Sequence, residues 1–538
     1  MNSEFNSNPL SLVVFWLVPI LSCIIGLHFT VIGVMGYNLA NIPGDLGDAR
    51  FNMYILEHGY QYITIQVKEL WDVQFMYPAH NILAYSDNLL GSMPLYALFR
   101  LLHIDRETSF QLWIIVVSIL NFISAFYVFG KLTNQSILAT AGAYIFAFSL
   151  FLFCQFNHPQ VFPRFISPLV IYWVLRYSDG FNLKYALYPM LGLVYQFYCG
   201  MYLGFLLTFI SAVLFLVLLA VNFRKAISEG FFKLPYLLKL ISIVALSVLI
   251  IAPLAIPYYK LSQILGPRDY AGIFPTLPFL QSYFFSTNIS VTWGFLSKHL
   301  IIDNIPWWDH PLFIGLIPWA AFVGTILFII TRFFKSDKTS FQVTPSQYLV
   351  PIIVTIILCI VLTLRIGHFT LYKWVYQIPG FSSLGTLLRI MNVLLFLFCL
   401  LVCLLANEVV KKNKTLIFSL LLIGVFTDNF SRPKEYIHFG KVASQNRLKN
   451  IVTQLNQVDW RTKKAFAYMP PHKENEAESA IQIDGMLASQ LVHKPCVNGY
   501  SSTSPQNYSD FWRDYNEKAL YFWLDANGID HSKVAQIK

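Results

Sequence analysis

The sequence predicts an all-α polytopic membrane protein with about eleven transmembrane helices, a structured first extracytoplasmic loop and a small mixed extracytoplasmic C-terminal region. The 538-residue chain is 56% hydrophobic and 12% charged, with a mean hydropathy of +0.55. That balance lies outside the range of water-soluble domains. Apolar runs of about 20 residues, long enough to span a bilayer, recur along the whole chain. Helices satisfy their own backbone hydrogen bonds, so a helical bundle accommodates these runs in lipid.

The first apolar run begins near Leu10, behind an N-terminus without Lys or Arg, and no small-residue cleavage site follows it. These features indicate a retained helix rather than a signal peptide. Later runs are separated by short polar or basic loops. The expected spans lie near 11–33, 108–129, 136–154, 163–177, 183–199, 201–222, 239–260, 311–332, 347–366, 387–408 and 414–428.

The basic residues of the short loops predict the orientation of these spans. If the N-terminus is cytoplasmic, the basic loops fall on one side of the membrane, as the positive-inside rule requires. That side carries Lys131, Arg176, Lys184, Arg224, Lys225, Lys233, Lys239, Arg332, Lys335, Lys338, Lys411, Lys412 and Lys414. The opposite side receives the loops 34–107, 154–162, 258–310 and 367–386 and the tail from about 429. We therefore expect a cytoplasmic N-terminus and an extracytoplasmic C-terminus.

We expect two regions, a transmembrane domain over 1–428 and an extracytoplasmic C-terminal region over 429–538. The first loop, 34–107, contains a helical stretch at 49–58 and an amphipathic run at 89–102 of the kind that lies in a membrane interface. The tail is markedly more polar than the rest of the chain, with Trp, Tyr and Pro scattered through it. It is consistent with a small folded domain or a cap on the outer loops.

Composition excludes two other classes of site. The net charge of +10 does not indicate a nucleic-acid partner, because the basic residues lie in short loops and no basic stripe with interleaved aromatic residues occurs. Six of the seven Cys residues lie in or beside apolar runs without metal-ligand spacing. Neither a disulfide framework nor a zinc site follows from them.

Two carboxylates, Asp45 and Asp48, stand directly behind the first apolar run. Asp48 precedes a helical stretch and could be its N-cap, and Asp45 lies between glycines and could be a turn residue. Alternatively, a carboxylate at the outer mouth of the bundle is suited to act as a general base or to bind a cation. No further acidic cluster completes a convincing metal site, so we expect no cofactor, although a divalent metal is not excluded.

Two arginines stand alike at outer helix ends. Arg164 follows the segment 155–163, and Arg389 follows the segment 379–388. Placing an arginine at the bilayer centre costs about 2.5–3.5 kcal/mol on insertion scales. Each could instead extend to the interface, or its guanidinium could hold a phosphate at membrane depth.

Three weaker candidates for the same phosphate are His158, Arg268 and Lys298. A single loop histidine such as His158 is more often structural. Arg268 and Lys298 belong to the outer loop 258–310, whose aromatic and charged content is also typical of an interfacial belt. The candidates together suit a ligand with a phosphate head and a hydrocarbon tail.

The sequence Asp48-Ala49-Arg50-Phe51 in the first outer loop resembles the GT-C superfamily of membrane glycosyltransferases. Further motifs resemble bacterial GT-C members of the YfhO-like type. These motifs are Gly44-Asp45, Leu56-Glu57-His58, Tyr77-Pro78, Pro379-Gly380-Phe381, Leu388-Arg389 and Val497-Asn498-Gly499-Tyr500-Ser501 with Pro505. They are spread over the whole chain, and each is short.

The resemblance implies a bacterial inner-membrane enzyme that moves a sugar from a polyprenyl-phosphate donor to an envelope glycan, lipid or protein on the extracytoplasmic face, with inversion. It implies Asp48 as the base, with Asp45 as the alternative, and cations that stabilise the departing phosphate. The first candidates for these cations are Arg164 and Arg389, and the weaker candidates are His158, Arg268 and Lys298. Residues expected to position the first loop are Arg50, Glu57 and His58. No later outer loop carries a second acidic motif of the metal-dependent oligosaccharyltransferase kind.

Two other functions use the same residues. A transporter or flippase of lipid-linked sugars would use them as a gate, but transporters usually show internal repeats and ionisable residues near mid-membrane. No clear repeat is present, and most charges lie at the ends of the expected helices. A non-catalytic membrane protein that binds a lipid-linked sugar is the third possibility, because a fold does not guarantee an activity.

Overall fold

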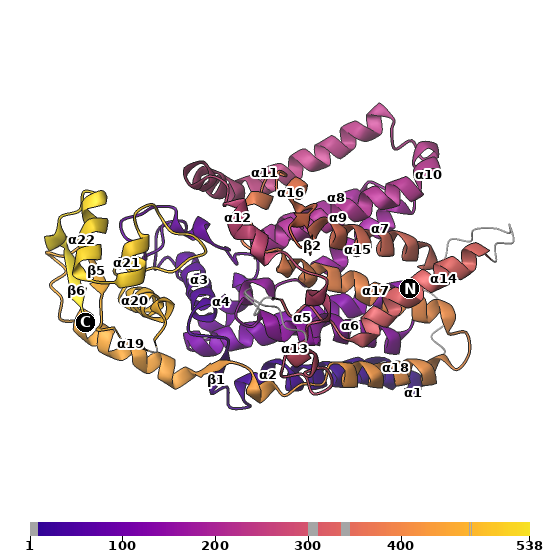
Figure 1. The fold of residues 1–538 in the computed structure, drawn as a ribbon, viewed down its shortest axis with the longest axis horizontal. Helices are drawn as coiled ribbons and strands as arrows, with labels where there is room; N and C mark the ends of the chain where they lie inside the picture. Colours follow the sequence, from indigo (N-terminus) through magenta and orange to yellow (C-terminus); the bar gives the residue numbers. More distant parts are fainter. Residues whose placement is uncertain (1–8, 300–309, 335–344, 473, 475) are drawn as a thin grey trace.

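Long helices lying side by side form most of the molecule (Figure 1). The computed structural model describes residues 9–299, 310–334, 345–472, 474 and 476–538. Each of the eleven expected spans overlaps a helix. These helices are α1 (Pro9–Phe29), α5 (Arg106–Thr133), α6 (Ser136–Phe148), α7 (Ser167–Ser178), α8 (Lys184–Cys199), α9 (Met201–Val221), α11 (Leu234–Leu265), α14 (Leu316–Phe334), α15 (Leu349–Thr363), α17 (Met391–Val409) and α18 (Lys414–Asp428).

The prediction of an all-α polytopic membrane protein is confirmed, and the protein is an integral membrane protein. Within the described residues, seven helical segments are long and apolar enough to cross a membrane. Helices α7, α8, α15 and α18 are shorter, with 12 to 16 residues each. The total of eleven spans therefore stays a prediction.

Helices α6 and α17 form the centre of the bundle. Every residue of α6 from Leu138 to Phe148 is buried, and so is every residue of α17 from Met391 to Leu404. The ring of Phe396 stacks on Phe129 of α5 and meets Phe146 edge-on. Such continuous burial explains why these two sequences are apolar on all sides rather than amphipathic.

Helices α11 and α14 lie at the outside of the bundle. Their apolar side chains are largely exposed, as at Ile241, Leu249 and Leu327. A helix that is apolar all round and packed on one side only suits contact with lipid chains. In Figure 1, α11 crosses the top of the view, and the small helix α10 (Phe223–Ser228) precedes it at the right.

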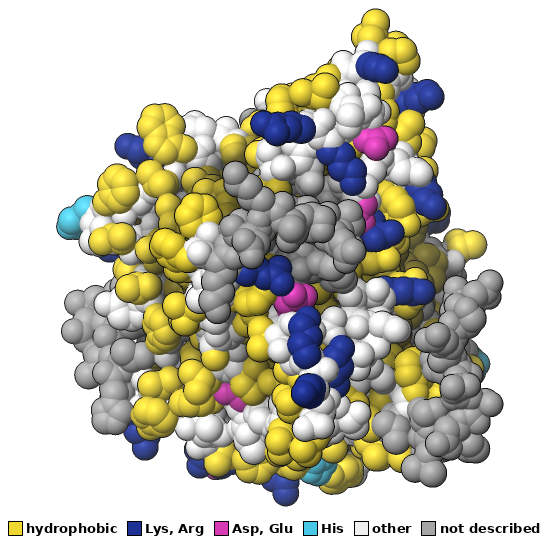
Figure 2. All heavy atoms as spheres, turned by 90° about the vertical axis from the view of Figure 1, so that its right-hand side faces the viewer, with side chains coloured by type: hydrophobic (Ala, Val, Ile, Leu, Met, Phe, Trp, Pro, Cys, Tyr) yellow, Lys and Arg dark blue, Asp and Glu magenta, His cyan; other side chains and the backbone are white. Residues whose placement is uncertain are grey.

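Lys and Arg side chains gather at the end of the bundle opposite the C-terminal region. Figure 2 shows this end, where they lie among exposed apolar side chains. The last turn of α7, the start of α10 and the loop after α17 lie there, and they contribute Arg176, Arg224, Lys225, Lys411 and Lys412 among others. Two further basic residues expected on this side, Lys335 and Lys338, lie outside the described residues. The distribution agrees with the expected cytoplasmic face, which itself stays a prediction.

The first loop is folded at the other end of the bundle. After α2 (Val31–Met35) it contains β1 (Asn41–Pro43), α3 (Asp48–Ile63) and α4 (Met93–Leu101). The expected helical stretch 49–58 is thus part of a longer helix. Helix α4 lies within the expected amphipathic run.

The C-terminal region mixes helices and short strands. Its elements are β4 (His438–Gly440), α19 (Lys441–Leu455), β5 (Ala465–Tyr468), α20 (Glu478–Val492), α21 (Ser509–Asp514), α22 (Glu517–Ala526) and β6 (Val534–Ile537). Strands β5 and β6 pair in parallel, and β4 pairs antiparallel with β1 of the first loop, with Ile42 opposite Phe439. The remaining short elements of the outer loops are α12 (Tyr270–Ile273), α13 (Leu296–His299), β2 (Arg365–Ile366), β3 (Phe369–Thr370) and α16 (Tyr372–Val375).

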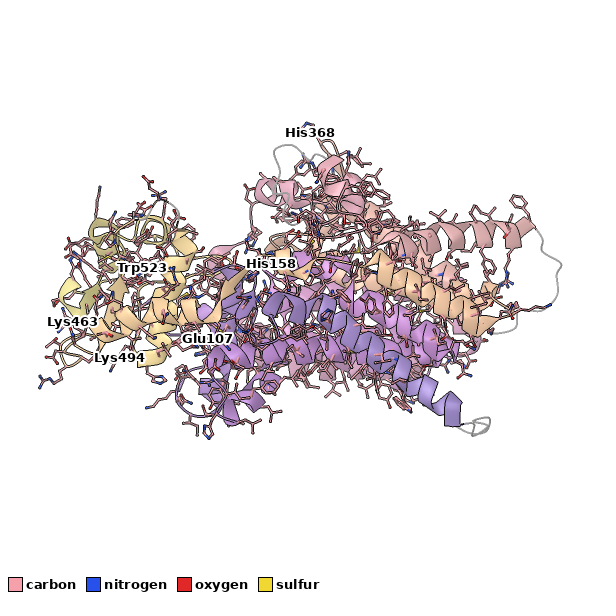
Figure 3. The ribbon with its side chains drawn as sticks, turned by 90° about the horizontal axis from the view of Figure 1, so that it is seen from below. Glu107, His158, His368, Lys463, Lys494 and Trp523 are labelled. Carbon is pink, nitrogen blue, oxygen red and sulfur yellow. The ribbon has the colours of Figure 1, made fainter. Side chains whose placement is uncertain are left out.

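A second backbone pairing joins the first loop to the C-terminal region. The Cys496 amide donates to the Gln74 carbonyl at 2.8 Å, and the Met76 amide donates to the Asn498 carbonyl at 3.1 Å. A Cβ atom on Gly499 would lie 2.2 Å from Cγ of Met76, so only glycine fits there. The Trp523 indole, labelled in Figure 3, donates to the Tyr77 carbonyl at 2.8 Å. The two segments therefore fold against each other, although more than 400 residues separate them along the chain.

Candidate active site

Asp48 is the first residue of α3, and its carboxylate is held by two residues from distant parts of the chain. Its Oδ2 atom lies 2.8 Å from Nδ1 of His158, and its Oδ1 atom accepts a hydrogen bond of 2.5 Å from the Tyr500 hydroxyl. The N-cap position belongs to Gly47, so the Asp48 carboxylate does not cap the helix. Figure 3 shows His158 where the bundle meets the C-terminal region. The Asp48 side chain remains 22% exposed, so a ligand can reach it.

The surroundings of Asp48 favour its ionised form. Burial acts to raise the pKa of this carboxyl, but the hydrogen bond and charge of His158, the Tyr500 hydroxyl and the positive charge of Arg389 outweigh it. The net result is a pKa below the ordinary value of aspartate. A carboxylate that is ionised and partly exposed can accept a proton.

Asp45 has a different environment, three residues earlier. Its Oδ1 atom accepts a hydrogen bond of 2.9 Å from the Gly47 amide, which closes a local turn. Burial and the neighbouring charge of Asp48 raise the pKa of Asp45. The two carboxyl groups therefore differ in acidity, because the pKa of Asp48 is lowered and that of Asp45 is raised.

Arg389 stands just before α17, and its positive charge acts on Asp48. Its guanidinium carbon lies 4.8 Å from the ring centroid of Tyr202, at the start of α9. The Tyr202 hydroxyl in turn accepts a hydrogen bond of 2.5 Å from the Thr386 amide. The backbone amide of Tyr202 donates to Oδ1 of Asp87 at 3.1 Å. Asp87 is a buried carboxylate of the first loop. The charge of Arg389 therefore favours the ionised form of both Asp48 and Asp87.

Arg268 is a second cation near Arg389. Its Nε donates to the Ser383 carbonyl at 3.0 Å, and one terminal nitrogen donates to the Ser502 carbonyl at 3.1 Å. The Ser502 hydroxyl reaches back to the Tyr85 carbonyl at 2.5 Å. Burial lowers the pKa of Arg268, and the like charge of Arg389 lowers it further. Two guanidinium groups whose charges act on each other suit the binding of a phosphate.

Comparison with solved structures identifies this arrangement of helices. No family model matches the chain, and no curated protein matches it in sequence. The oligosaccharyltransferase of Archaeoglobus fulgidus in complex with Zn and sulfate superimposes with a TM-score of 0.51 and 9% identity, over 95% of this chain and 67% of that one. Its apo form gives a TM-score of 0.50 with 12% identity, over 98% of this chain and 70% of that one. The chain has the GT-C fold.

Arg164 takes a different place in this GT-C fold from Arg389. Its side chain is wholly buried, with one terminal nitrogen donating to Oδ1 of Asn392 at 2.7 Å and the other to the Phe146 carbonyl at 2.8 Å. The guanidinium also lies 4.9 Å from the Phe146 ring centroid. It bonds α6 to α17 inside the bundle, and the expectation that it binds phosphate stays a prediction.

Lys298 lies on α13, in the part of the outer loop 258–310 that contacts the residues after α18. It is exposed on α13, and the segment before α13 pairs with the residues after α18, where the Val291 amide donates to the Phe430 carbonyl at 3.0 Å. Residues 300–309 of the same loop lie outside the described residues. The structure therefore groups Arg268, but not Lys298, with Arg389.

Arg50 is buried beneath the site, between the first loop and the C-terminal region. One terminal nitrogen lies 2.6 Å from Oδ1 of Asp484 in α20. Arg447 of α19 binds the other oxygen of Asp484 at 2.6 Å and also pairs with Glu476. A single carboxylate thus holds two arginines from opposite sides of the interface, as a residue positioning the loop would require.

Removing the shared carboxylate has a large expected effect on stability. Asp484→Ala leaves Arg50 buried without its counter-charge and facing Arg447, so we expect the free energy of unfolding to fall by about 3–5 kcal/mol. Thermal unfolding in detergent measures the change. The matched control is Asp510→Ala, which breaks an exposed pair with Arg513 and should change little. Equal effects of the two substitutions would show that the buried network does not hold the interface.

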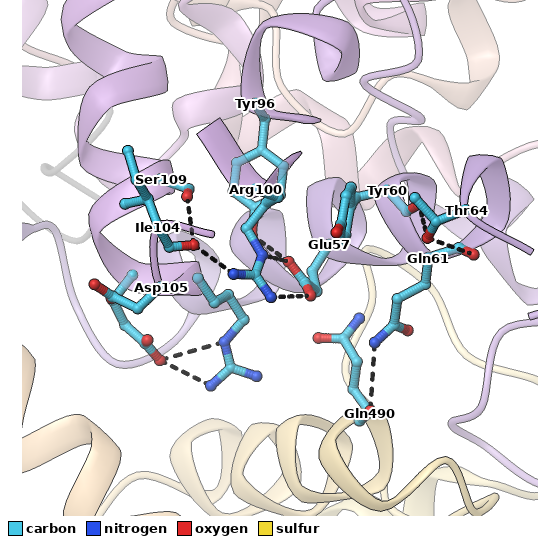
Figure 4. A network of polar contacts seen from close by, with 12 residues as sticks. Glu57, Tyr60, Gln61, Thr64, Tyr96, Arg100, Ile104, Asp105, Ser109 and Gln490 are labelled. Atoms are coloured by element: carbon cyan, nitrogen blue, oxygen red, sulfur yellow. Dashed lines mark hydrogen bonds and ion pairs between the residues drawn. The ribbon is translucent and has the colours of Figure 1, made fainter. Parts of the chain in front are cut away.

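Glu57 and His58 have fixed partners within the first loop. Figure 4 shows the contacts of the Glu57 carboxylate with two residues of α4. The Tyr96 hydroxyl donates to Oε2 at 2.5 Å, and Arg100 binds both carboxylate oxygens at 2.8 and 3.0 Å. This network joins α3 to α4. His58 Nε2 lies 2.9 Å from the Leu70 carbonyl and so anchors the segment after α3. Neither residue contacts Asp48 in the part of the chain that the structure describes, which suits loop positioning rather than chemistry.

The donor groups around Asp48 can be compared with what a metal ion requires, and the expectation that no metal is used stays a prediction. Within the described ranges, no group of three or more His, Cys, Asp or Glu side chains could hold a metal ion. The Asp48 oxygens are already engaged by His158 and Tyr500, and Oδ1 of Asp45 is engaged by a backbone amide. Magnesium needs near-octahedral oxygen ligands, and calcium needs six to eight.

Three residues of the site were not among the candidates from sequence, namely Asp87, Tyr202 and Tyr500. Tyr500 follows Gly499 in the motif 497–501. A glycine beside an aromatic residue in an otherwise polar tail is the feature of the sequence that could have marked Tyr500 as a site residue. Tyr202 is the second residue of an apolar helix, where a tyrosine is also typical of an interface. Nothing in the local sequence distinguishes Asp87 from an aspartate that serves only as an exposed loop residue.

Proposed function

We propose that the protein is an inverting glycosyltransferase that moves a sugar from a polyprenyl-phosphate donor to an acceptor on the extracytoplasmic face of a bacterial inner membrane. The observation that carries the proposal is the contact of Asp48 with His158 and Tyr500 beside the Arg389–Arg268 pair. A base and a pair of cations next to apolar helices match a substrate that combines a hydroxyl, a phosphate and a lipid tail.

In the proposed reaction, an acceptor hydroxyl oxygen attacks the anomeric carbon of the donor sugar. Its proton passes to Asp48, the bond between the anomeric carbon and the phosphate oxygen breaks, and the electron pair leaves with the polyprenyl phosphate. Attack opposite the leaving group inverts the anomeric centre. Arg389 and Arg268 stabilise the negative charge on the departing phosphate. His158 and Tyr500 hold the base ionised and in place.

The same proposal assigns the sides of the membrane. The first loop and the C-terminal region form one folded unit at one end of the bundle, and the basic loops lie at the other. With the basic end in the cytoplasm, the site opens on the extracytoplasmic face. Surrounding membrane lipids would contact the exposed apolar faces of α11 and α14. The proposal assigns charge stabilisation to arginines and takes no step through a metal.

A reconstituted assay separates this proposal from a transporter. The purified protein is placed in liposomes that contain a radiolabelled polyprenyl-phosphate sugar and an extract of envelope glycans as acceptor. A transferase converts the label into glycan and leaves free polyprenyl phosphate. Movement of intact lipid-linked sugar between leaflets, with no transfer, would instead identify a flippase. Binding without either event would identify a non-catalytic protein.

The Tyr500 hydroxyl gives a test that depends on pH. A hydrogen bond donated to an ionised carboxylate favours that form, so Tyr500→Phe should raise the pKa of Asp48. Because the base must be ionised, the acid limb of the pH profile of kcat/KM should move to higher pH. The control is Tyr508→Phe, whose hydroxyl bonds the Val497 carbonyl nearby but does not reach Asp48. An unchanged acid limb in Tyr500→Phe would contradict the assignment.

A further inference from the structure

The side chain of Asn392 bonds two segments that carry site residues, one leading to His158 and the other ending at Arg389. Asn392 stands in the first turn of α17 and is wholly buried. Its Nδ2 atom donates to Oε1 of Gln155 at 3.2 Å and to the Arg389 carbonyl at 3.1 Å. Gln155 ends a short 3₁₀ helix, Leu150–Gln155, three positions before His158. One amide thus joins the segment of the base partner to the segment of the cation.

The contact with Gln155 passes directly to His158. The His158 amide donates to the Gln155 carbonyl at 2.8 Å, so the two residues belong to one hydrogen-bonded turn. Gln155 is buried, whereas the His158 side chain is 16% exposed and its Nδ1 lies 2.8 Å from Oδ2 of Asp48. A fixed Gln155 therefore limits where the imidazole can lie.

Arg164 determines which way the Asn392 amide points. A guanidinium can only donate hydrogen bonds, so its 2.7 Å bond to Asn392 requires the oxygen of that amide to face it. The amide nitrogen then faces Gln155 and Arg389, which both present oxygen atoms. Beside a partner that can donate or accept, the amide could turn over and lose both bonds. The side chains of Arg164, Asn392 and Gln155 are here called the amide clasp.

An arginine is not needed for packing at this place. The Arg164 side chain is buried, and its terminal nitrogens bond neutral oxygens, those of Asn392 and the Phe146 carbonyl. No carboxylate pairs with it in the part of the chain that the structure describes. Replacing buried charged groups with apolar side chains of similar volume is often neutral or stabilising. Contact between α6 and α17 therefore does not explain the guanidinium, whereas orienting Asn392 does.

We propose that the amide clasp positions His158 and Arg389 relative to Asp48, so that its three members are positioning residues of the transfer reaction. The inference rests on the proposed function and makes it more specific. It gives Arg164 a part in the reaction that needs no contact with the donor.

The pH profile of the enzyme reports whether the clasp holds its two targets. The charged and titratable groups that act on Asp48, or on which it acts, are Asp45 of the same loop, His158, Arg389 and Tyr500. Of these, the clasp holds His158 and Arg389, and both lower the pKa of Asp48. A loosened clasp should therefore raise the pKa of Asp48 and move the acid limb of kcat/KM to higher pH. A residue that only joins helices would not move it.

Gln155→Met tests the arm of the clasp that leads to His158. Methionine is of similar size and offers no oxygen to Asn392. We expect kcat/KM to fall about threefold to tenfold and its acid limb to rise by about half a pH unit or more, with undecaprenyl phosphate bound as before. The control is Gln111→Met, which removes a buried amide that bonds two carbonyls of the first loop instead. An unmoved acid limb in Gln155→Met, or an equal shift in the control, would overturn the proposal.

Arg164→Met combined with Asn392→Leu removes the rest of the clasp without leaving a buried charge. Because both replacements are apolar, thermal stability in detergent should stay close to that of the wild type. We expect the acid limb to move as in Gln155→Met. In addition, undecaprenyl phosphate should bind about threefold to tenfold more weakly, because Arg389 is no longer held. Normal stability with an unchanged acid limb and unchanged phosphate binding would show a purely structural network.

A chemical measurement keeps this inference separate from the proposed function. Diethyl pyrocarbonate modifies accessible imidazoles, and mass spectrometry of the digested protein gives the rate at His158. We expect Gln155→Met to speed that modification at least about twofold and to leave the buried His58 unchanged. If the wild type transfers sugar but the variant keeps its pH profile and its His158 rate, the clasp fails alone. If no transfer occurs but His158 reacts faster in the variant, the proposed function fails and the clasp is supported.

Discussion

Replacing Asp48 with asparagine is expected to lower the rate of sugar transfer by about 10²–10⁴-fold, which is the usual contribution of a general base. Asparagine keeps the size of the side chain and can still bond His158 or Tyr500, so the fold and donor binding should persist. What it loses is the ability to take a proton from the acceptor hydroxyl. Single-turnover measurement of transfer from a radiolabelled polyprenyl-phosphate sugar reports that step directly.

Asp45→Asn is the matched comparison for this prediction. Asp45 stands three residues away, forms a local turn and has a raised pKa, so its loss should change the rate much less. If Asp48→Asn is fully active while Asp45→Asn is inactive, the proton acceptor is Asp45. Full activity in both variants would refute acid–base catalysis by this segment altogether.

Arg389→Ala is expected to weaken binding of undecaprenyl phosphate about 10- to 100-fold. Hydrogen bonds to a charged group contribute about 1.5–3 kcal/mol each, and about 1.4 kcal/mol corresponds to a factor of ten. Arg389→Lys should recover part of the affinity, because it keeps the charge and loses the planar fork. Binding is measured by tryptophan fluorescence or calorimetry in detergent.

Lys298→Ala serves as the control for Arg389. It removes a cation from another outer loop, exposed on α13 and grouped with the end of α18, so donor binding should not change. An effect of Lys298→Ala as large as that of Arg389→Ala would indicate general attraction of the phosphate by surface charge. Such an attraction would also decline with added salt, whereas binding at a partly buried arginine pair declines less.

The helices could be predicted from the sequence because each depends on a local property. An apolar run of the right length forms a helix in lipid whatever its neighbours, and all eleven expected segments overlap helices. Their ends were less predictable. Residues 163–166 precede α7 because the chain bonds locally there, with the Ser167 amide donating to the Arg164 carbonyl at 2.9 Å.

The site could be predicted only in part, because its contacts are between distant residues. Asp48 and His158 were both candidates, yet a separation of 110 residues gives no sign that they pair. Arg164 and Arg389 look alike in sequence, since each precedes an apolar run. Their difference depends on Asn392 and the Phe146 carbonyl, which engage one of them inside the bundle. No local pattern contains that information.

The hydroxyl that holds Asp48 comes from a residue 452 positions later in the chain. A ribosome therefore adds 452 residues after Asp48 to reach Tyr500, and the C-terminal region must then fold against the first loop before the carboxylate has its partner. Until that moment the nascent chain carries the base and His158, without the group that completes their arrangement. The order of synthesis thus keeps the site unfinished while the helices insert, and a chain that ends before the segment 496–500 carries an incomplete site.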